Sequence, residues 1–594
     1  MAVLTVLATL GAHTASAGLP QTFTVNSTAD TNTLANRQAC LSASTTDSCT
    51  LRAAISLENN NNNQPTQDFI NFDISGTSTL NVGSALPTVT EPLVLDGENP
   101  IGTGVILDGQ GGNYGAMVFA AGNSWLRNII VRHFGLSGNP IKAVELQSGD
   151  ANLVTNSWFQ SIVGTGLHIA DSDNNQIGGS GAGEGNLFQT SNGAGLEISS
   201  LASTTQVFGN KFGTNFSGTA ALGNQTGLRD LGIASIIGGA AAGEGNLISG
   251  NITGLRLGGT DAVVQGNLVG TQSDGTSALP NTGPGIHVVG GEDILIGGTG
   301  AERNVIAFNQ QAGIVAGDSG ENVEIRGNSI HSNNGAGILF AALVINSIEF
   351  TVRANSIFGN GGLGIDFGGG PVPNDAGDGD PGANLLQNHP NVTAAVAASA
   401  AITIDGSLSS APSSTYTVDF YASPVCNAPV PNNFGEGKRF LGSKTVQTAG
   451  NGIIAFSFTL LKVVAAGDVV TATATDAAGN TSEFSRCRVV TTAVVTCEGQ
   501  TATIVGSASD NAINGTAGDD VIAGRAGEDT INGLGGNDSI CGGPDNDDLK
   551  GGDGTDTLNG GPHGADPPAD KCTGGPNPAG QPDVLRPSCE TQIP

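Results

Sequence analysis

The sequence predicts an all-β chain made of a right-handed parallel β-helix, an antiparallel β-sandwich and a parallel β-roll, in that order. Three observations support this prediction. Glycine provides 92 of the 594 residues while only 12% are charged, a composition typical of short strands and tight turns rather than helices. A loose repeat runs through residues 68–391, and a strict nine-residue repeat fills residues 506–559. Alternating strands lie between the two repeats.

Residues 1–17 are predicted to be a secretory signal peptide, because an apolar run is followed by Ala15-Ser16-Ala17. No other stretch reaches the ~18 apolar residues that a membrane-spanning helix needs. The eight cysteines, an even number, agree with an oxidising compartment. We therefore expect a secreted protein, located extracellularly or at the cell surface. Proximity in the sequence suggests four disulfide pairs: Cys40–Cys49, Cys426–Cys487, Cys497–Cys541 and Cys572–Cys589.

Residues 18–67 are predicted to form a cap over the open first coil of the β-helix. A strand is expected at Thr22–Asn26, and a short amphipathic helix at Thr50–Glu58. Residues 49–55, CTLRAAI, resemble the CSLREA motif found near the start of exported bacterial β-helix proteins. Ala53 stands where that motif has Glu, so any salt bridge of that Glu is absent here.

Residues 68–391 carry the signature Gly-[Leu/Ile]-x-apolar about every 28 residues, between Gly166 and Gly364. Asparagine-centred strands are interleaved with it, and stacked asparagine side chains can hydrogen-bond one another between coils. These asparagines are Asn128, Asn156, Asn186, Asn246, Asn267, Asn304, Asn328 and Asn355. One strand per repeat and turns at fixed positions indicate a parallel β-helix. The stretch resembles the pectate-lyase-like superfamily.

The variable position of the signature is expected to point outward and to form one column of side chains. The column contains His168, Glu197, Arg229, Arg256, His287, Val315, Leu339 and Asp366. Glu197 with Arg229 and Arg256 would be the catalytic candidates if this face belonged to a polysaccharide lyase or glycoside hydrolase. Outward strand positions are ordinarily polar, however, and the region has neither clustered aspartates nor many aromatic platforms. The sequence therefore favours binding over catalysis.

Residues 392–490 change to alternating strands such as 416–421 and 469–474, which predict an antiparallel sandwich. Residues 474–484, ATDAAGNTSEF, resemble an immunoglobulin-like module of bacterial surface proteins. Just before the sandwich, Asp375, Asp378 and Asp380 lie among glycines. They fit either a loop calcium site or a turn-rich exit from the last coil, and both alternatives stay open.

Residues 497–561 are predicted to form a β-roll from six uninterrupted nine-residue units. Position one is always glycine, which permits tight turns, and position eight is always Ile or Leu, which fills a thin core. Position six is Asn511, Asp520, Asp529, Asp538, Asp547 and Asp556. Residues 562–594 are expected to be a Pro/Gly-rich tail.

Two units make one turn of such a roll, so alternate position-six aspartates lie one strand spacing apart, about 4.8 Å. Like charges at that distance repel by about 0.9 kcal/mol in water and about 3.5 kcal/mol at an effective dielectric of 20. A hard cation between the carboxylates removes this repulsion, and carboxylates with turn carbonyls suit calcium. The segment resembles the hemolysin-type (RTX) repeat GGxGxDxUx, which implies calcium as the cofactor; Asn511 departs from the pattern.

The net charge of −31 would be repelled by phosphate backbones, so nucleic acid is not an expected partner. The function predicted from the sequence is a secreted, calcium-binding surface protein that binds extracellular glycans or matrix components. The alternative is a polysaccharide lyase or glycoside hydrolase on the β-helix face.

Overall fold

The computed structural model describes residues 20–42, 48–60, 66–76, 78–98, 104–317, 320–341, 349–398, 400–427, 433–562, 570–576, 582–589 and 591–593. The predicted signal peptide, residues 1–17, lies outside these ranges. The chain divides into two compact units, residues 1–490 and 491–594. Among the described residues, no helix has the length and hydropathy to cross a membrane.

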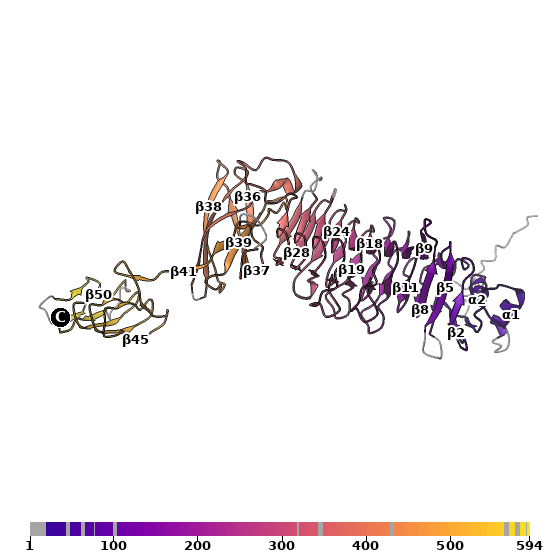
Figure 1. Ribbon diagram of the computed structural model, residues 1–594, viewed down its shortest axis with the longest axis horizontal. Helices are drawn as coiled ribbons and strands as arrows, with labels where there is room; N and C mark the ends of the chain where they lie inside the picture. The colour runs from indigo at the N-terminus through magenta and orange to yellow at the C-terminus, as the bar shows by residue number, and fades with distance from the viewer. Residues whose placement is uncertain are drawn as a thin grey trace, which may run out of the picture. The chain divides into compact units, whose positions relative to one another are not determined.

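The larger unit is built on three long parallel sheets that share one core (Figure 1). The first contains β1 (Thr22–Val25), β2 (Asp68–Phe72), β4 (Leu93–Asp96), β7 (Trp125–Arg127), β10 (Leu153–Thr155), β13 (Gln176–Gly178), β16 (Gln206–Phe208), β19 (Ile236–Ile237), β22 (Val263–Val264), β25 (Leu295–Gly297), β28 (Val323–Arg326) and β31 (Phe350–Arg353).

The second contains β3 (Thr79–Asn81), β5 (Val105–Gly112), β8 (Ile129–Phe134), β11 (Trp158–Gln160), β14 (Leu187–Gln189), β17 (Lys211–Phe212), β20 (Leu247–Ile248), β23 (Leu268–Val269), β26 (Val305–Ala307), β29 (Ser329–His331) and β32 (Ser356–Phe358). The third contains β6 (Met117–Phe119), β9 (Ile141–Leu146), β12 (Gly164–Ile169), β15 (Ala194–Ile198), β18 (Thr226–Asp230), β21 (Thr253–Leu257), β24 (Ile286–Val288), β27 (Ile314–Ala316), β30 (Ile338–Phe340) and β33 (Ile365–Asp366).

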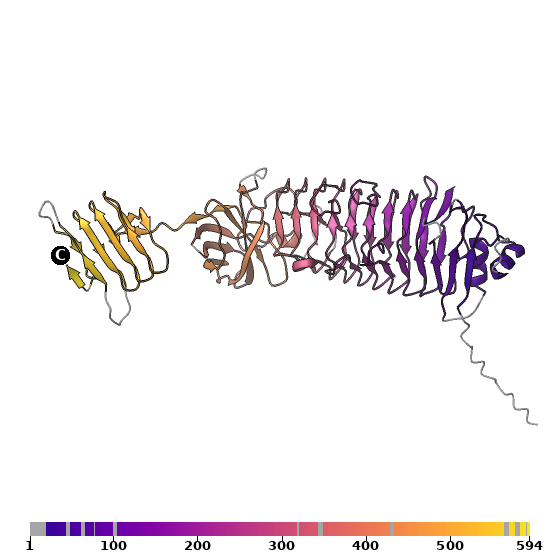
Figure 2. The same cartoon turned by 90° about the horizontal axis from the view of Figure 1, so that it is seen from below.

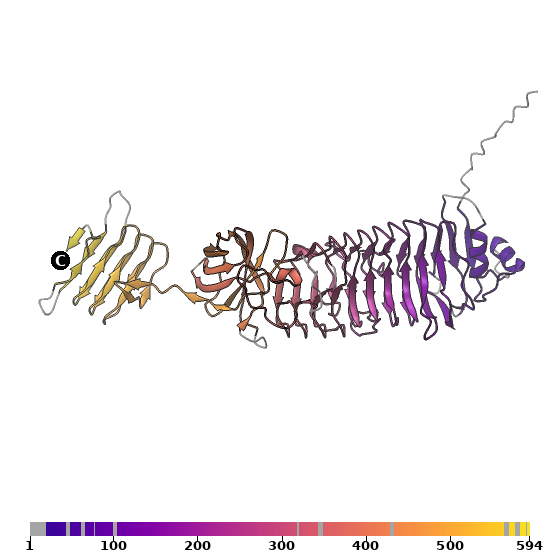
Figure 3. The same ribbon diagram turned by 90° about the horizontal axis from the view of Figure 1, so that it is seen from above.

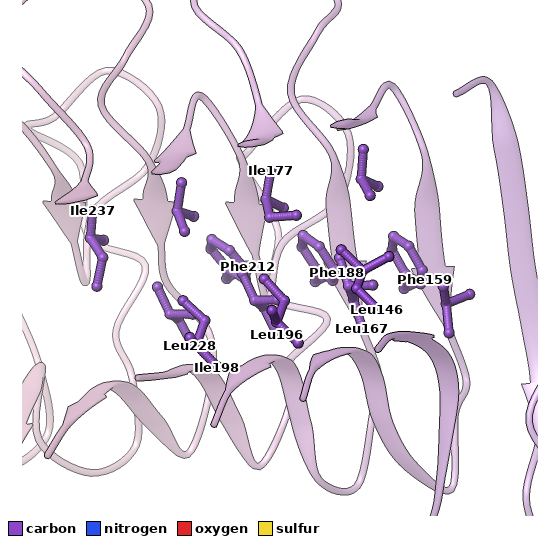
Figure 4. Close-up of a cluster of buried hydrophobic side chains, with 14 of the residues drawn as sticks. Leu146, Phe159, Leu167, Ile177, Phe188, Leu196, Ile198, Phe212, Leu228 and Ile237 are labelled. Atoms are coloured by element: carbon purple, nitrogen blue, oxygen red, sulfur yellow. The ribbon is translucent and has the colours of Figure 1, made fainter. Parts of the chain in front are cut away.

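From β4 to β33, consecutive strands of the chain belong to different sheets, so each coil adds one strand to each sheet (Figure 2). This arrangement confirms the predicted parallel β-helix. Its core consists of like residues stacked from coil to coil (Figure 4). Phe159, Phe188 and Phe212 form a column with ring centroids 4.8 Å apart and nearly parallel planes. The strands can be as short as two residues because stacking, rather than strand length, buries their apolar side chains.

Two asparagine ladders run along the bends of the β-helix. In each ladder, Nδ2 of one asparagine donates to Oδ1 of the asparagine in the next coil, and at every step but that from Asn281 the backbone N–H does so too. The first ladder contains Asn186, Asn210, Asn246, Asn267, Asn304, Asn328 and Asn355. The second contains Asn224, Asn251, Asn281, Asn309, Asn333 and Asn360.

The structure confirms six of the eight predicted ladder asparagines. Asn128 and Asn156 differ: both have positive φ, and Asn156 Nδ2 donates to Asn128 Oδ1 at 2.7 Å outside the two ladders. Asn210 and the second ladder were not predicted. The asparagines of the second ladder recur every 24–30 residues, but they lie in the turns before the third-sheet strands rather than at the start of an apolar strand.

Two helices cap the first coil: α1 (Leu34–Ser42) and α2 (Leu51–Glu58). Thr50 caps α2 by accepting a hydrogen bond from the Ala53 N–H, and the buried face of α2 includes Leu51 and Ile55. The predicted helix at Thr50–Glu58 is therefore confirmed as α2, and the predicted strand at Thr22–Asn26 is confirmed as β1. The sequence did not predict α1, which is only weakly amphipathic and is held by the Cys40–Cys49 disulfide.

An antiparallel sandwich closes the other end of the β-helix. One sheet contains β34 (Asn391–Ala397), β35 (Ile402–Ser409) and β38 (Ile453–Leu460); the other contains β36 (Thr415–Ser423), β37 (Arg439–Gln447), β39 (Val469–Thr475) and β40 (Arg488–Val489). Arg353 of the last coils forms two hydrogen bonds with Asp419 at 2.8 and 2.9 Å. Glu436 accepts hydrogen bonds from Asn360 and thereby ends the second asparagine ladder. The sandwich is thus part of one compact unit with the β-helix.

Short 3₁₀ helices at Gly300–Glu302 (η1) and Ala383–Leu386 (η2) complete the described elements of the larger unit. The Cys426–Cys487 disulfide lies in the sandwich.

The smaller unit begins with a short strand, β41 (Thr491–Thr492), and a hairpin, β42 (Thr496–Cys497) and β43 (Gln500–Thr501). A roll of two parallel sheets follows (Figure 3). One sheet contains β44 (Ile504–Val505), β46 (Val521–Ala523), β48 (Ser539–Cys541), β50 (Thr557–Asn559) and β52 (Val584–Leu585); the other contains β45 (Ala512–Asn514), β47 (Thr530–Gly535), β49 (Asp548–Asp553), β51 (Lys571–Thr573) and β53 (Thr591–Ile593). The position-eight aliphatic residues pack between the two sheets.

The predicted tail at 562–594 is corrected: β51, β52 and β53 continue both sheets of the roll. The nine-residue spacing fails after residue 560, yet Cys572 and Leu585 still occupy core positions beside Leu549 and Leu558. Disulfides Cys497–Cys541 and Cys572–Cys589 hold this unit, so all four predicted pairings are confirmed.

Candidate metal centre

Two ladders of position-six residues run along the roll, one per sheet. Each residue sits just before a strand, so the parallel register stacks it on its counterpart in the next turn. The backbone N–H of each residue donates to Oδ1 of the next one in its ladder, at 2.7–2.8 Å. The first carboxylate ladder contains Asn511, Asp529, Asp547 and Asp570; the second contains Asp520, Asp538, Asp556 and Asp583.

The second carboxylate oxygen of most ladder residues is buried and has no hydrogen-bond donor in the described part of the chain. Asp538 and Asp547, for example, are 2% and 3% exposed, and Oδ2 of each is unpaired. Among the described residues, the unpaired ladder atoms are Oδ2 of Asp529, Asp538, Asp547 and Asp556. Burying a carboxylate oxygen without a hydrogen-bond partner is unfavourable in free energy, so a bound cation would stabilise these atoms.

Glycine at position one makes room for these carboxylates. A Cβ at Gly533 would lie 2.2 Å from Oδ2 of Asp538, and a Cβ at Gly542 would lie 2.1 Å from Oδ2 of Asp547. Real Cβ atoms do not approach an oxygen so closely. The spacing of five residues between position one and position six, which recurs in every unit, therefore has a steric cause as well as a conformational one.

Burial raises the pKa of Asp547 to about 7 and that of Asp538 to about 6, with further upward contributions from the neighbouring ladder carboxylates. Burial also raises the pKa of Asp529 and Asp556. The ionised ladders are thus unfavourable by themselves. Stacked carboxylates with unpaired oxygens, next to turn carbonyls, match the all-oxygen ligand set that calcium prefers. The residues present therefore fit a calcium ion.

The ladder residues differ in how well they suit a cation. Asn511 has no carboxylate; its side chain instead hydrogen-bonds Ser507, so it ends the first carboxylate ladder. Asp570 and Asp583 were missed by the sequence reasoning because they lie beyond the regular repeat. Their signal is local: each is followed two residues later by a core residue, Cys572 or Leu585, as in the intact units.

The second predicted metal cluster is brought together in space. Carboxylate oxygens of Asp375, Asp378 and Asp380 lie within 4.8 Å of one another. However, Asp378 already accepts hydrogen bonds from Gln387, Asn388 and Ser410, and burial raises its pKa to about 6. These contacts suit a structured loop as well as a metal site, so calcium at this cluster stays a prediction.

The outward column of the third sheet has the predicted register. His168, Glu197, Arg229 and Arg256 pair on successive strands β12, β15, β18 and β21. Arg229 Nη1 and Glu197 Oε1 are 3.0 Å apart, whereas Arg256 is exposed. The catalytic role considered for these three residues stays a prediction.

Two further residues near His168 were not predicted, because β9 lacks the glycine signature: Glu145 continues the column, and Lys142 pairs with Thr165. Glu145 Oε1 lies 2.9 Å from His168 Nδ1, and Lys142 Nζ lies 2.8 Å from the same nitrogen. Burial, together with the charge of Lys142, lowers the pKa of His168.

Comparison with known proteins gives one family match and several structural likenesses. The model of the RTX calcium-binding nonapeptide repeat (4 copies) matches residues 505–540 and 538–562, so this segment carries calcium-binding repeats. No curated protein matches the chain.

Among solved structures, the AlgE6 A-module of the Azotobacter vinelandii mannuronan C-5 epimerase is 12% identical, with a TM-score of 0.30 over 53% of this chain and 85% of that one. The AlgE4 A-module from the same organism is 13% identical, with a TM-score of 0.29 over 53% and 91%. The enzymatically active domain of bacteriophage CBA120 tailspike protein 2 is 10% identical, with a TM-score of 0.26 over 74% and 73%. Likenesses this distant carry no argument about function.

Proposed function

We propose that this protein is a secreted, calcium-binding β-solenoid surface protein whose C-terminal roll folds when it binds calcium, and whose β-helix binds extracellular glycans or matrix components. The observation that carries the proposal is the set of unpaired, buried Oδ2 atoms in the two carboxylate ladders. Calcium would be held by Asp520, Asp529, Asp538, Asp547 and Asp556, with Asp570 and Asp583 added from the structure.

Calcium-dependent folding follows from the thin core of the roll. One aliphatic residue per unit, with two cysteines, provides most of the buried apolar surface. Stacked ionised carboxylates oppose folding, and a ligand that binds only the folded state stabilises it in proportion to the logarithm of its concentration. Extracellular calcium modules typically bind with dissociation constants of about 10⁻⁴–10⁻³ M. The roll would then fold after export into a calcium-rich medium.

The test uses the full chain, dialysed against a chelator and then titrated with calcium or magnesium. The readout is limited proteolysis of residues 491–594, because a folded roll resists cleavage. We expect protection at millimolar calcium and little at equal magnesium. Asp529→Asn should shift the calcium midpoint upward about tenfold. The matched control is Glu528→Gln, which removes the same charge from the neighbouring exposed residue.

Protection that is complete without calcium, or equal midpoints for the two variants, would contradict the calcium part of the proposal. The alternative of a polysaccharide lyase or glycoside hydrolase predicts new reducing ends when the calcium-loaded protein is incubated with polysaccharides. A purely adhesive protein produces none.

A further inference from the structure

A clasp of covalent and polar contacts lies on the outer face of one sheet of the roll. We define the clasp as Cys497 and Glu498 of the β42–β43 hairpin together with Cys541, Asn559 and Arg586 of the roll. Cys497 and Cys541 form a disulfide. Oε1 of Glu498 accepts a hydrogen bond from Nδ2 of Asn559 at 2.8 Å, and Oε2 accepts one from Nε of Arg586 at 3.1 Å. The hairpin is thus fastened to three turns of the same sheet, at β48, at β50 and just after β52.

The clasp holds the strands that follow the second carboxylate ladder. Each of its roll residues lies three positions after a ladder aspartate, in the pairs Asp538 and Cys541, Asp556 and Asn559, and Asp583 and Arg586. Cys541 and Asn559 are direct partners on β48 and β50, and the N–H of Arg586 donates to Leu558 O at 2.9 Å. The clasp residues of successive turns therefore lie side by side. Fastening them also fixes the spacing of the aspartates that precede them.

Glu498 occupies a backbone conformation that favours other residue types. With Gly499 it forms the two-residue turn of the hairpin, and its φ is +50°. Asn, Asp and Gly usually take such left-handed positions. The glutamate is therefore explained by its side chain, whose carboxylate bridges two turns of the roll. Hydrogen bonding to Arg586 lowers the pKa of Glu498, so this carboxylate stays ionised at neutral pH.

The clasp reduces the conformational freedom that the roll must lose when it binds calcium. The disulfide Cys497–Cys541 joins residues 44 apart in the sequence. A cross-link over such a loop favours the folded state by roughly a hundredfold, because the unfolded chain has fewer conformations. A site whose ligands are already in place binds more tightly than one that the ligand must assemble. The ladder beside the clasp should therefore bind calcium more tightly than the same aspartates would without it.

We propose that the clasp keeps the second carboxylate ladder in register before calcium binds, so that the calcium affinity of the roll depends on the oxidation of Cys497 and Cys541 and on Glu498. This inference rests on the calcium-dependent folding of the roll in the proposed function. An external dithiol would reverse the effect: it gives two electrons and two protons to the disulfide, which becomes two thiols, and closes into a disulfide of its own. The roll would then fold most readily where the medium is both oxidising and rich in calcium.

The test is a calcium titration of the full chain, after dialysis against a chelator, with protection of residues 491–594 from proteolysis as the readout. The double variant Cys497→Ser, Cys541→Ser should raise the calcium midpoint about fivefold, because the loss of stability is shared between several calcium ions. Saturating calcium should restore its full protection. Glu498→Ala removes only the polar contacts and should raise the midpoint about twofold. Wild-type protein treated with a dithiol also loses Cys572–Cys589, so its midpoint should rise at least as far as that of the double variant.

The matched control is the double variant Cys426→Ser, Cys487→Ser, which removes the disulfide of the sandwich and should leave the calcium midpoint of the roll unchanged. Equal midpoints for the two double variants would overturn this inference and leave calcium-dependent folding intact. A clasp variant that no calcium concentration protects would also overturn it, because the clasp would then be required for the fold itself rather than for affinity. Protection of the wild-type roll that is complete without calcium would instead refute the calcium part of the proposed function, and this inference with it.

Discussion

The first asparagine ladder allows a quantitative prediction at Asn246, which is 1% exposed. Its Nδ2 donates to Val207 O at 2.8 Å and to Asn267 Oδ1 at 2.9 Å. Its Oδ1 accepts from the backbone N–H and Nδ2 of Asn210 at 2.9 and 3.1 Å. Asn246→Ala removes all four hydrogen bonds.

The groups that hydrogen-bond to the Asn246 side chain are affected differently by this substitution, because some of them keep another hydrogen bond. Val207 O keeps the N–H of Gly238 at 2.9 Å, and Asn210 Nδ2 keeps Ile177 O at 2.8 Å. The backbone N–H of Asn210 is left buried with no acceptor, which costs about 1–3 kcal/mol, while each lost bond contributes about 1 kcal/mol. With the orphaned N–H and the three other lost bonds, Asn246→Ala should destabilise the β-helix by roughly 4–6 kcal/mol. Asn246→Asp should cost more, because it places a carboxylate oxygen against two acceptors.

The assay is guanidinium unfolding of the full chain followed by tryptophan fluorescence. Both tryptophans, Trp125 and Trp158, lie in the β-helix, so the signal reports this part of the molecule. Asn192→Ala is the control, since that side chain is exposed and belongs to neither ladder. An unfolding midpoint for Asn246→Ala equal to that of Asn192→Ala would refute the reasoning.

Two further predictions concern Glu58 and Gly533. Glu58 is fully buried, and neither of its carboxylate oxygens has a hydrogen-bond partner among the described residues. Burial, with the charges of Asp68 and Glu91, raises its pKa to about 8. The folded state thus holds a proton that the unfolded state releases, so the stability of the cap should fall by up to about 5 kcal/mol between pH 4.5 and 8. Glu58→Gln should abolish this fall when unfolding is measured as a function of pH. A pH profile that Glu58→Gln leaves unchanged would contradict the prediction. Gly533→Ala should displace the Asp538 carboxylate and so raise, about tenfold, the calcium concentration at which half of the roll is protected from proteolysis. Gly535→Ala is the control and should leave this midpoint unchanged, because a Cβ there meets nothing closer than 3.7 Å. Equal midpoints for the two variants would disprove the steric role of Gly533.

The repeats made most of the fold predictable, because in a solenoid one residue per coil sets the register of a whole column. The predicted outward column from His168 to Asp366 pairs strand by strand as expected. Prediction failed where the spacing changes. Asn210 and Asn246 are 36 residues apart because the chain between them includes an inserted loop, yet their side chains are adjacent.

The candidate site residues could likewise be predicted where the repeat is regular and were missed where it is not. The regular nonapeptides identified Asp520 to Asp556. Asp570 and Asp583 were missed because they follow their ladder neighbours by 23 and 27 residues instead of the regular 18. Lys142 was missed because its contact with His168 depends on strand pairing that no motif records. The unpaired carboxylate oxygens could not be predicted from sequence, since they depend on what surrounds the side chain in three dimensions.

The two kinds of ladder explain why calcium dependence should be confined to the roll. An asparagine side chain carries both donors and an acceptor, so a stacked column such as Asn210, Asn246 and Asn267 satisfies itself. An ionised aspartate carries only acceptors. In the roll, the backbone N–H satisfies Oδ1, and Oδ2 of Asp529, Asp538, Asp547 and Asp556 has no donor among the described residues. The β-helix should therefore keep its stability in a chelator, while the roll loses its folded state in the same solution.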